Sequence, residues 1–293
     1  MKKPKSDPDE SLEIARKFLE ILKPVVDSVS VLPWTTRDGF WTVVVRAVLR
    51  RQFDWLEGSI ELVKSRRSDM SIALLRPACE EFLWIKYLRT LSKEDREVVI
   101  LAKNDVEAYR SLKAQLDDSG QDVMRKIGFP DDFLEGYKVA NDEAEKKLKG
   151  IGARLGWNLR KNQVVPSLAL IARTVNEKGL YDLIYHATSR TVHFSVSELF
   201  RRAWGSPEKL TISSKYMNGY WKTFTLYWTV RIFFFTFVEI GAEFEEQGVA
   251  LRGIDGRRFL PLMRRFTKRG MVPIITPREM NLHLKDPSKA FRF

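Results

Sequence analysis

The sequence predicts an all-α fold, a multi-helix bundle with a central apolar helix. Apolar residues recur three and four positions apart along most of the 293-residue chain, which is the period of an amphipathic helix. Hydrophobic residues make up 44% of the chain, enough to build a real core. The sequence also has no internal repeat, no low-complexity tract and no strand-rich region. The expected exception is a small irregular hairpin near 203–215, around Gly205-Ser206-Pro207.

A few residues set the expected helix ends. Pro24 should stop or kink the first helix. Asp38, after a turn at 32–34, can cap the second. Ser92 with Asp95 makes a capping-box-like start to a charged helix, which should form an antiparallel hairpin with a later one. The apolar side of the second helix is expected to carry Phe40, Val43, Val44, Ala47, Val48, Phe53, Leu56, Ile60 and Val63. Helices are expected at about 9–22, 38–64, 69–90, 92–116, 122–127, 131–151, 166–175, 179–195, 218–246 and 257–268.

The helix at about 69–90 is apolar nearly all round, so a central position is expected for it. Arg76 and Glu80 lie inside its apolar stripe, four residues apart, and can satisfy each other. They should be paired, because an isolated buried ion costs several kcal/mol. Pro77 between them should bend the helix. The pair is then either a buried salt bridge that fixes the register or part of a site.

The division expected from the sequence is a helical bundle at 9–248 and a basic C-terminal helix with an extended tail at 249–293. The formal net charge is +12, which favours anionic partners. Residues 249–293 contain eleven Lys and Arg residues against three acidic ones, so most of the excess is in this part. It is expected to bind nucleic acid, RNA above all, or a partner protein. The candidate nucleic-acid-binding residues are Arg257, Arg258, Arg264, Arg265, Lys268 and Arg269.

Composition and motifs exclude several classes of protein. A single cysteine, Cys79, rules out an internal disulfide framework and fits a reducing cytoplasm. Neither a metal site nor a cofactor is expected, because no Cys/His cluster, Walker loop, GxGxxG, HExxH or GxSxG spacing occurs. No secretory signal is expected. The apolar run at 224–238 is shorter than a membrane span of about 20 residues and contains Arg231, so a buried helix is expected there.

The stretch 179–195 carries a second polar pattern. Read as a helix, it places Tyr181, Tyr185, Ser189 and His193 on one stripe, each four residues from the next. Its apolar residues gather on roughly the other side. The stripe therefore faces either solvent or a polar pocket.

The two patterns together carry a resemblance. The chain resembles a bacterial family of domains of unknown function that has an Arg-x3-Glu helix and a Tyr-x3-Ser-x3-His helix. The resemblance rests on Arg76-x3-Glu80, then Trp157, then Tyr181-x3-Tyr185-x3-Ser189-x3-His193. The similarity covers roughly 49–239. It implies an all-α fold and a shared polar site, but no particular reaction. If the two helices pack together, their five polar groups converge, which is how a bundle usually builds a site.

Three functions follow as hypotheses. The first is an interaction or sensor module whose Tyr, Ser and His form a polar network in the core. The alternative is a metal-independent, HEPN-like ribonuclease or RNA-binding protein, a class found in defence and toxin systems. Its general acid or base would be His193, Arg76 would stabilise phosphorane charge, and Tyr185 or Ser189 would orient the phosphate. A third is a pocket for a small anion at Arg76 and His193. HEPN ribonucleases place Arg and His on one segment as Arg-x4-6-His, whereas only two residues separate Arg190 from His193. A homo-oligomer is expected.

Overall fold

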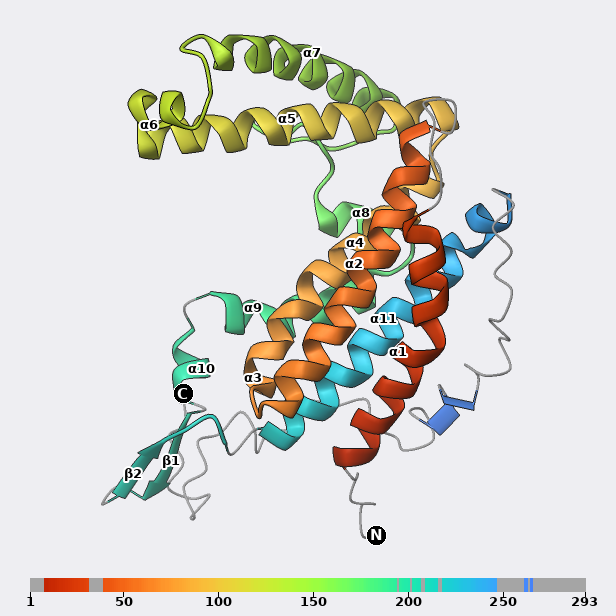
Figure 1. Ribbon diagram of the computed structural model, residues 1–293, viewed down its shortest axis with the longest axis vertical. Coiled ribbons are helices and arrows are strands. Elements are labelled where there is room, and N and C mark those ends of the chain that lie inside the picture. The colour runs from red at the N-terminus through yellow and green to blue at the C-terminus, as the bar shows by residue number, and fades with distance from the viewer. Residues whose placement is uncertain are drawn as a thin grey trace. The chain divides into compact units, whose positions relative to one another are not determined.

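The computed structural model describes residues 8–31, 39–193, 195–200, 202–206, 209–215, 218–246, 261–262 and 264–265. The described chain is all-α apart from one short hairpin, as predicted (Figure 1). Its helices are α1 (Pro8–Ser30), α2 (Gly39–Lys64), α3 (Ser68–Ser71), the 3-10 turn η2 (Ile72–Leu74), α4 (Leu75–Arg89), α5 (Lys93–Ser119), α6 (Gln121–Lys126), α7 (Phe133–Arg154), α8 (Leu168–Thr174), α9 (Lys178–Val192), α10 (Val196–Phe200) and α11 (Asn218–Glu246). Its strands are β1 (Ala203–Ser206) and β2 (Lys209–Ile212).

The chain forms two compact units. Unit 1 comprises 1–32, 45–85 and 178–293, and unit 2 comprises 33–44 and 86–177. The predicted boundary at residue 248 lies outside the described residues, as does the tail. Of the predicted C-terminal helix, 261–262 and 264–265 are described, and they are helical.

Unit 1 is built around the apolar helix α11, and not around the helix at 69–90 that was expected to be central (Figure 1). The ring of Phe233 lies 5.8 Å from that of Phe18 in α1 and 6.5 Å from that of Phe53 in α2. The ring of Phe235 lies 6.1 Å from that of Phe82 in α4. One long aromatic helix thus contacts three others. Its predicted bounds, 218–246, are confirmed.

Among the described helices, α11 is also long and apolar enough to cross a membrane, over Asn218–Gly241. Of the most apolar window, 67% is buried within the protein, which is also the behaviour of a core helix. The charge of Arg231 is accommodated by aromatic neighbours. Its guanidinium donates to the Tyr227 hydroxyl at 2.9 Å and lies 5.1 Å from the Trp228 ring.

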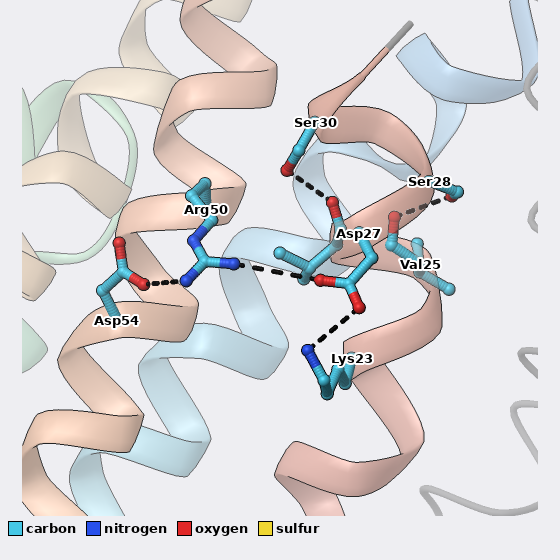
Figure 2. Close-up of polar contacts among 8 residues, drawn as sticks. Lys23, Val25, Asp27, Ser28, Ser30, Arg50 and Asp54 are labelled. Carbon is cyan, nitrogen blue, oxygen red and sulfur yellow. Dashed lines mark hydrogen bonds and ion pairs between the residues drawn. The ribbon is translucent and has the colours of Figure 1, made fainter.

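The first helix ends later than predicted, because α1 continues through Pro24 to Ser30. Proline removes one helical hydrogen bond, but apolar burial beyond it offsets this cost. The serine hydroxyls near the helix end donate to main-chain carbonyls, Ser28 to Val25 at 2.8 Å and Ser30 to Val26 at 2.6 Å (Figure 2). The apolar residues buried after the proline are Val25, Val26 and Val29.

The added turns bring Asp27 of α1 beside α2 in unit 1 (Figure 2). Its carboxylate pairs with Lys23 at 3.0 Å and lies 3.9 Å from the Arg50 guanidinium. Arg50 also pairs with Asp54, at 2.8 Å. These side chains are largely exposed, so the contacts orient the helices and stabilise them little.

The start of α2 is rotated relative to the prediction. Phe40 and Val43, expected in the core, are 39% and 41% exposed, whereas Trp41 is buried. The carboxylate of Glu97, from α5, accepts the backbone N–H of Phe40 at 2.9 Å and of Trp41 at 3.0 Å. This cap from another helix and the burial of Trp41 fix the rotation. Ala47 is likewise exposed, while the predicted core residues Phe53, Leu56, Ile60 and Val63 are buried. The predicted cap at Asp38 and the turn at 32–34 lie outside the described residues.

The predicted helix at 69–90 is broken into α3, η2 and α4. The 3-10 turn spans Ile72–Leu74 and precedes Pro77 by one turn. Because the ring of a helical proline clashes with the carbonyl four residues earlier, here Ala73, the turn lies where Pro77 disturbs the α-helix. The sequence predicted a bend at Pro77, and the structure shows a change of helix type one turn before it.

Two short elements follow α9. The helix α10 was not predicted from the sequence. The hairpin expected within 203–215 is confirmed, with β1 and β2 antiparallel in a register running from Ala203 opposite Ile212 to Ser206 opposite Lys209.

The largest part of unit 2 is a helical hairpin of α5 and α7, which lie side by side (Figure 1). The predicted cap is confirmed, because the Ser92 hydroxyl accepts the backbone N–H of Asp95 at 3.1 Å. Gly120, with φ of 79°, closes α5 in the left-handed region that glycine tolerates best. Arg154 at the end of α7 pairs with Asp95 at the start of α5. The two helices are therefore antiparallel, as predicted.

Candidate functional site

Arg76 occupies the first turn of α4 and pairs with Glu80 one turn later. Its Nε donates to the Glu80 carboxylate at 3.0 Å, so the predicted pair forms. The two side chains are 27% and 35% exposed. The prediction of a buried pair is therefore wrong: this face of α4 reaches the surface of unit 1. Because both groups keep contact with water, the pair does not carry the desolvation cost of a core ion pair.

The guanidinium of Arg76 also lies over the ring of Tyr185, on α9. The Cζ of Arg76 lies 4.9 Å from the ring centroid, a cation–π contact. Tyr181, one turn earlier, has its ring 5.4 Å from that of Tyr185 with an angle of 30° between the planes. Burial raises the pKa of the Tyr181 hydroxyl, and Tyr185 adds to the rise while Arg76 opposes it. The Tyr181 hydroxyl therefore stays protonated, and both tyrosines contribute the faces of their rings to the cluster.

His193 completes the cluster just beyond the end of α9. Its backbone N–H still donates to the Ser189 carbonyl at 3.0 Å, which extends the helical path by one residue. Its Nε2 lies 3.2 Å from Nη1 of Arg76, and the residue is exposed. A guanidinium can only donate, so Nε2 is the acceptor and this contact requires a neutral imidazole with its proton on Nδ1.

The opposite side of α9 holds the helix in place. Ile184, Ala187 and Thr188 are buried. The Thr188 hydroxyl donates to the Ile184 carbonyl at 2.8 Å, so its burial leaves no unsatisfied donor. α9 packs on η2, the turn directly before the helix that carries Arg76. The 3-10 turn thus helps to set where Arg76 meets α9.

The structure brings together Arg76, Glu80, Tyr185 and His193, four of the five predicted site residues. Ser189 lies between Tyr185 and His193 on the same side of α9 and is half-buried. Sequence reasoning placed Tyr181 on the stripe but left it out of the site, where its ring extends the aromatic surface. Lys178 was missed altogether. Its Nζ lies 5.6 Å from the Tyr181 ring, and the signal was its position three residues before that tyrosine.

Glu81, next to Glu80, faces the other way and joins α4 to α2. Its carboxylate accepts from the Trp55 indole at 3.2 Å and from Gln52 at 3.1 Å, and pairs with Arg51 at 2.8 Å. Burial raises the pKa of Glu81, although Arg51, Trp55 and Gln52 each act to lower it. Glu81 therefore holds α4 against α2, whereas Glu80 pairs with Arg76 at the surface.

A model described as "Family of unknown function (DUF5677)" matches residues 42–209, more than half of the chain. The chain belongs to the DUF5677 family. The matched range contains all five predicted site residues and ends before α11. The family description names no activity and shows no link to HEPN proteins. No curated protein and no solved structure matches the chain.

Four of the six predicted nucleic-acid-binding residues of this DUF5677 protein lie outside the described residues: Arg257, Arg258, Lys268 and Arg269. Arg264 is exposed. Arg265 pairs with Glu10 of α1 at 3.1 Å, so its charge is already partly matched within unit 1. Within the described ranges, no three His, Cys, Asp or Glu side chains gather in a way that could hold a metal ion.

Proposed function

We propose that this DUF5677 protein is an interaction or sensor module that recognises an anionic group between Arg76 and His193. The observation that carries the proposal is the 3.2 Å contact between these side chains at the surface of unit 1. Each occupies a hydrogen-bonding position that an incoming ligand could use. In this proposal an anion displaces the hydrogen bond between the two side chains and binds in its place.

The chemistry of Arg76 supports an anionic ligand. Glu80 holds its Nε, and Tyr185 supports the face of the guanidinium. The terminal nitrogens are thus presented in a fixed orientation, which lowers the entropy cost of binding. A carboxylate or phosphate is a stronger acceptor for them than a neutral imidazole. His193, once released, can itself donate to the anion.

The position of His193 supports a sensor. It is the first residue after α9, and the Ser195 hydroxyl accepts the backbone N–H of Glu198 at 3.4 Å in the first turn of α10. Movement of the imidazole would be passed to α10 by a very short connection. We propose this connection as the route from binding to partner recognition.

Titration with inorganic phosphate and with acetate, followed by the imidazole NMR signals of His193, tests the proposal. Either anion should shift these signals saturably. The shift should disappear in Arg76→Gln and persist in His186→Gln, a control on the same helix. Imidazole signals that ignore both anions would overturn the proposal.

A metal-independent, HEPN-like ribonuclease is the second candidate, favoured by the exposure of His193 beside a guanidinium. In this function His193 is the general acid or base, Arg76 stabilises phosphorane charge, and Tyr185 or Ser189 orients the phosphate. The weakness is that Nε2, the atom a base would use, already accepts a hydrogen bond from Arg76. Cleavage of RNA in the presence of a chelator, lost in His193→Ala but kept in His186→Ala, would replace the first proposal with this one.

Binding of RNA or of a partner protein by the basic C-terminal region stays a prediction, and so do a homo-oligomer, a cytoplasmic location and a role in defence or toxin systems.

A further inference from the structure

A second polar site lies in unit 1, between the end of α2 and the start of α11. It is a cavity of about 580 Å³. The residues that line it are Ser65, Arg66, Arg67, Ser214, Lys215 and Asn218. Three of the six are cationic and none is acidic.

The three cations of this cavity are not neutralised within the described chain. Among the described residues, Arg66, Arg67 and Lys215 make no ion pair, whereas other arginines of the unit, such as Arg50 and Arg202, do. All three residues are exposed, so an anion entering the cavity meets three cationic side chains and displaces no ion pair that the described residues form. Serine hydroxyls and the Asn218 amide supply neutral hydrogen-bonding groups around them.

Hydrogen bonds fix the two walls of the cavity relative to each other. The Asn218 side chain accepts the backbone N–H of Ser68 at 3.3 Å, which ties the start of α11 to the 65–67 wall. Next to Ser68 in the chain, the Asp69 carboxylate pairs with Arg202 at 3.1 Å. The Arg202 carbonyl in turn accepts the backbone N–H of Ser213 at 2.6 Å.

The same chain of contacts continues to Lys215. Its backbone N–H donates to the Ser213 hydroxyl at 3.2 Å. Both walls are therefore held before any ligand arrives, as a binding site requires.

The backbone of Arg66 gives an independent argument. Arg66 N–H donates to the Val63 carbonyl at 3.1 Å, and Arg67 N–H donates to the Leu62 carbonyl at 2.7 Å, which is the Schellman pattern that ends a helix. Arg66 has φ of 58° at the position where glycine is the favoured residue. An arginine there keeps a strained backbone, and such strain is a feature of functional sites.

We infer that this cavity binds a phosphate group, carried either by a small molecule or by a nucleic-acid backbone. Arginine forks match phosphate oxygens in pairs, and Lys215 adds a point charge on the opposite wall. Asn218 begins α11, a long helix whose N-terminal end favours an anion. The inference goes beyond the Arg76–His193 proposal and does not depend on it.

The test follows the side-chain amide signals of Asn218 by NMR during titration with pyrophosphate and, separately, with a short single-stranded oligoribonucleotide. Saturable shifts with pyrophosphate support a small phosphate ligand. Shifts with the oligonucleotide alone support a phosphodiester backbone. In either case Arg67→Gln should weaken binding about tenfold or more, and Arg110→Gln, on α5 of unit 2, should not.

Arg66→Gly separates binding from folding. Glycine relieves the left-handed backbone, so this variant should melt about 2–4 °C higher and still bind the phosphate probe about tenfold more weakly. Asn218 signals that respond to neither probe, or binding that is equal in wild type, Arg66→Gly and Arg67→Gln, would overturn the inference. A response at His193 alone would leave the Arg76 proposal standing without this one.

Discussion

The guanidinium of Arg76 has three neighbours of different chemistry: a carboxylate, an aromatic face and an imidazole acceptor. Each uses a different part of a planar, forked cation. Lysine, a point charge on a flexible stem, cannot make all three contacts at once. The geometry therefore depends on arginine itself as well as on its positive charge.

Arg76→Lys should consequently change the state of His193 more than it changes stability. The loss in unfolding free energy should be under about 1 kcal/mol, because the Glu80 pair is half-exposed. The Nε2 signal of His193 in nitrogen-detected NMR spectra should shift as its donor is lost, with a mixture of tautomers replacing the Nδ1–H form. Arg50→Lys, at another exposed pair, is the control. An unchanged His193 spectrum in Arg76→Lys would show that the contact does not form in solution.

A pH-dependent prediction concerns Glu81. Burial raises its pKa in the folded state above the ordinary value of 4.5. A raised pKa contributes stability that is fully present below the unfolded-state value and is lost as the pH rises through the folded-state value. Wild type should therefore gain stability relative to Glu81→Gln as the pH falls from neutral through the folded-state pKa of Glu81 toward its unfolded-state pKa. Urea unfolding of both proteins across this range measures the difference, and a difference that does not vary with pH would contradict the assignment.

The helices differ in how far their sequences predict them. The bounds of α11 and the Ser92 cap could be predicted because both depend on neighbours within a few residues. The end of α1 could not be, because the penalty at Pro24 is offset by burial against other helices. The rotation of α2 was missed for a similar reason, since a carboxylate from α5 caps its first turn.

The same division applies to the candidate site. Spacing alone gave the Arg76–Glu80 pair and the stripe on α9, and the family resemblance suggested that they meet. Their half-exposure depends on which neighbours cover α4, and the periodicity of one helix does not reveal that. The phosphate cavity had no sequence signal, because an arginine at the position of a helix-ending glycine conceals the turn that forms its wall.

A pair of glycines on α7 provides a test at the level of one helix. A Cβ added at Gly152 would lie 2.9 Å from Cε3 of Trp157, whose indole N–H donates to the Tyr87 hydroxyl. A Cβ at Gly150 would meet nothing within 4 Å. Gly152→Ala should destabilise the protein by about 1–3 kcal/mol through overpacking. Gly150→Ala should stabilise it by about 0.5–1 kcal/mol through helix propensity. Chemical denaturation of the two variants measures both values, and equal effects would refute the packing at Trp157.

The chain folds into two compact units, and the helices α2 and α4 each contribute residues to both. The candidate sites, Arg76–His193 and the phosphate cavity, both belong to unit 1. Unit 2 has its own buried residues, which include Val99, Ala102, Val106 and Leu148. Separate cores imply that each unit can open without the other.

Matched leucines test this independence. Leu148 of α7 and Leu226 of α11 are both fully buried, at 0% exposure, in different units. Either change to alanine should cost about 2–5 kcal/mol locally. In native-state hydrogen exchange, Leu148→Ala should speed exchange in α5 and α7 and leave α11 protected, and Leu226→Ala should do the reverse. If either variant lowered protection equally in both units, the chain would unfold as one cooperative body, and anion binding in unit 1 would then stabilise unit 2 as well.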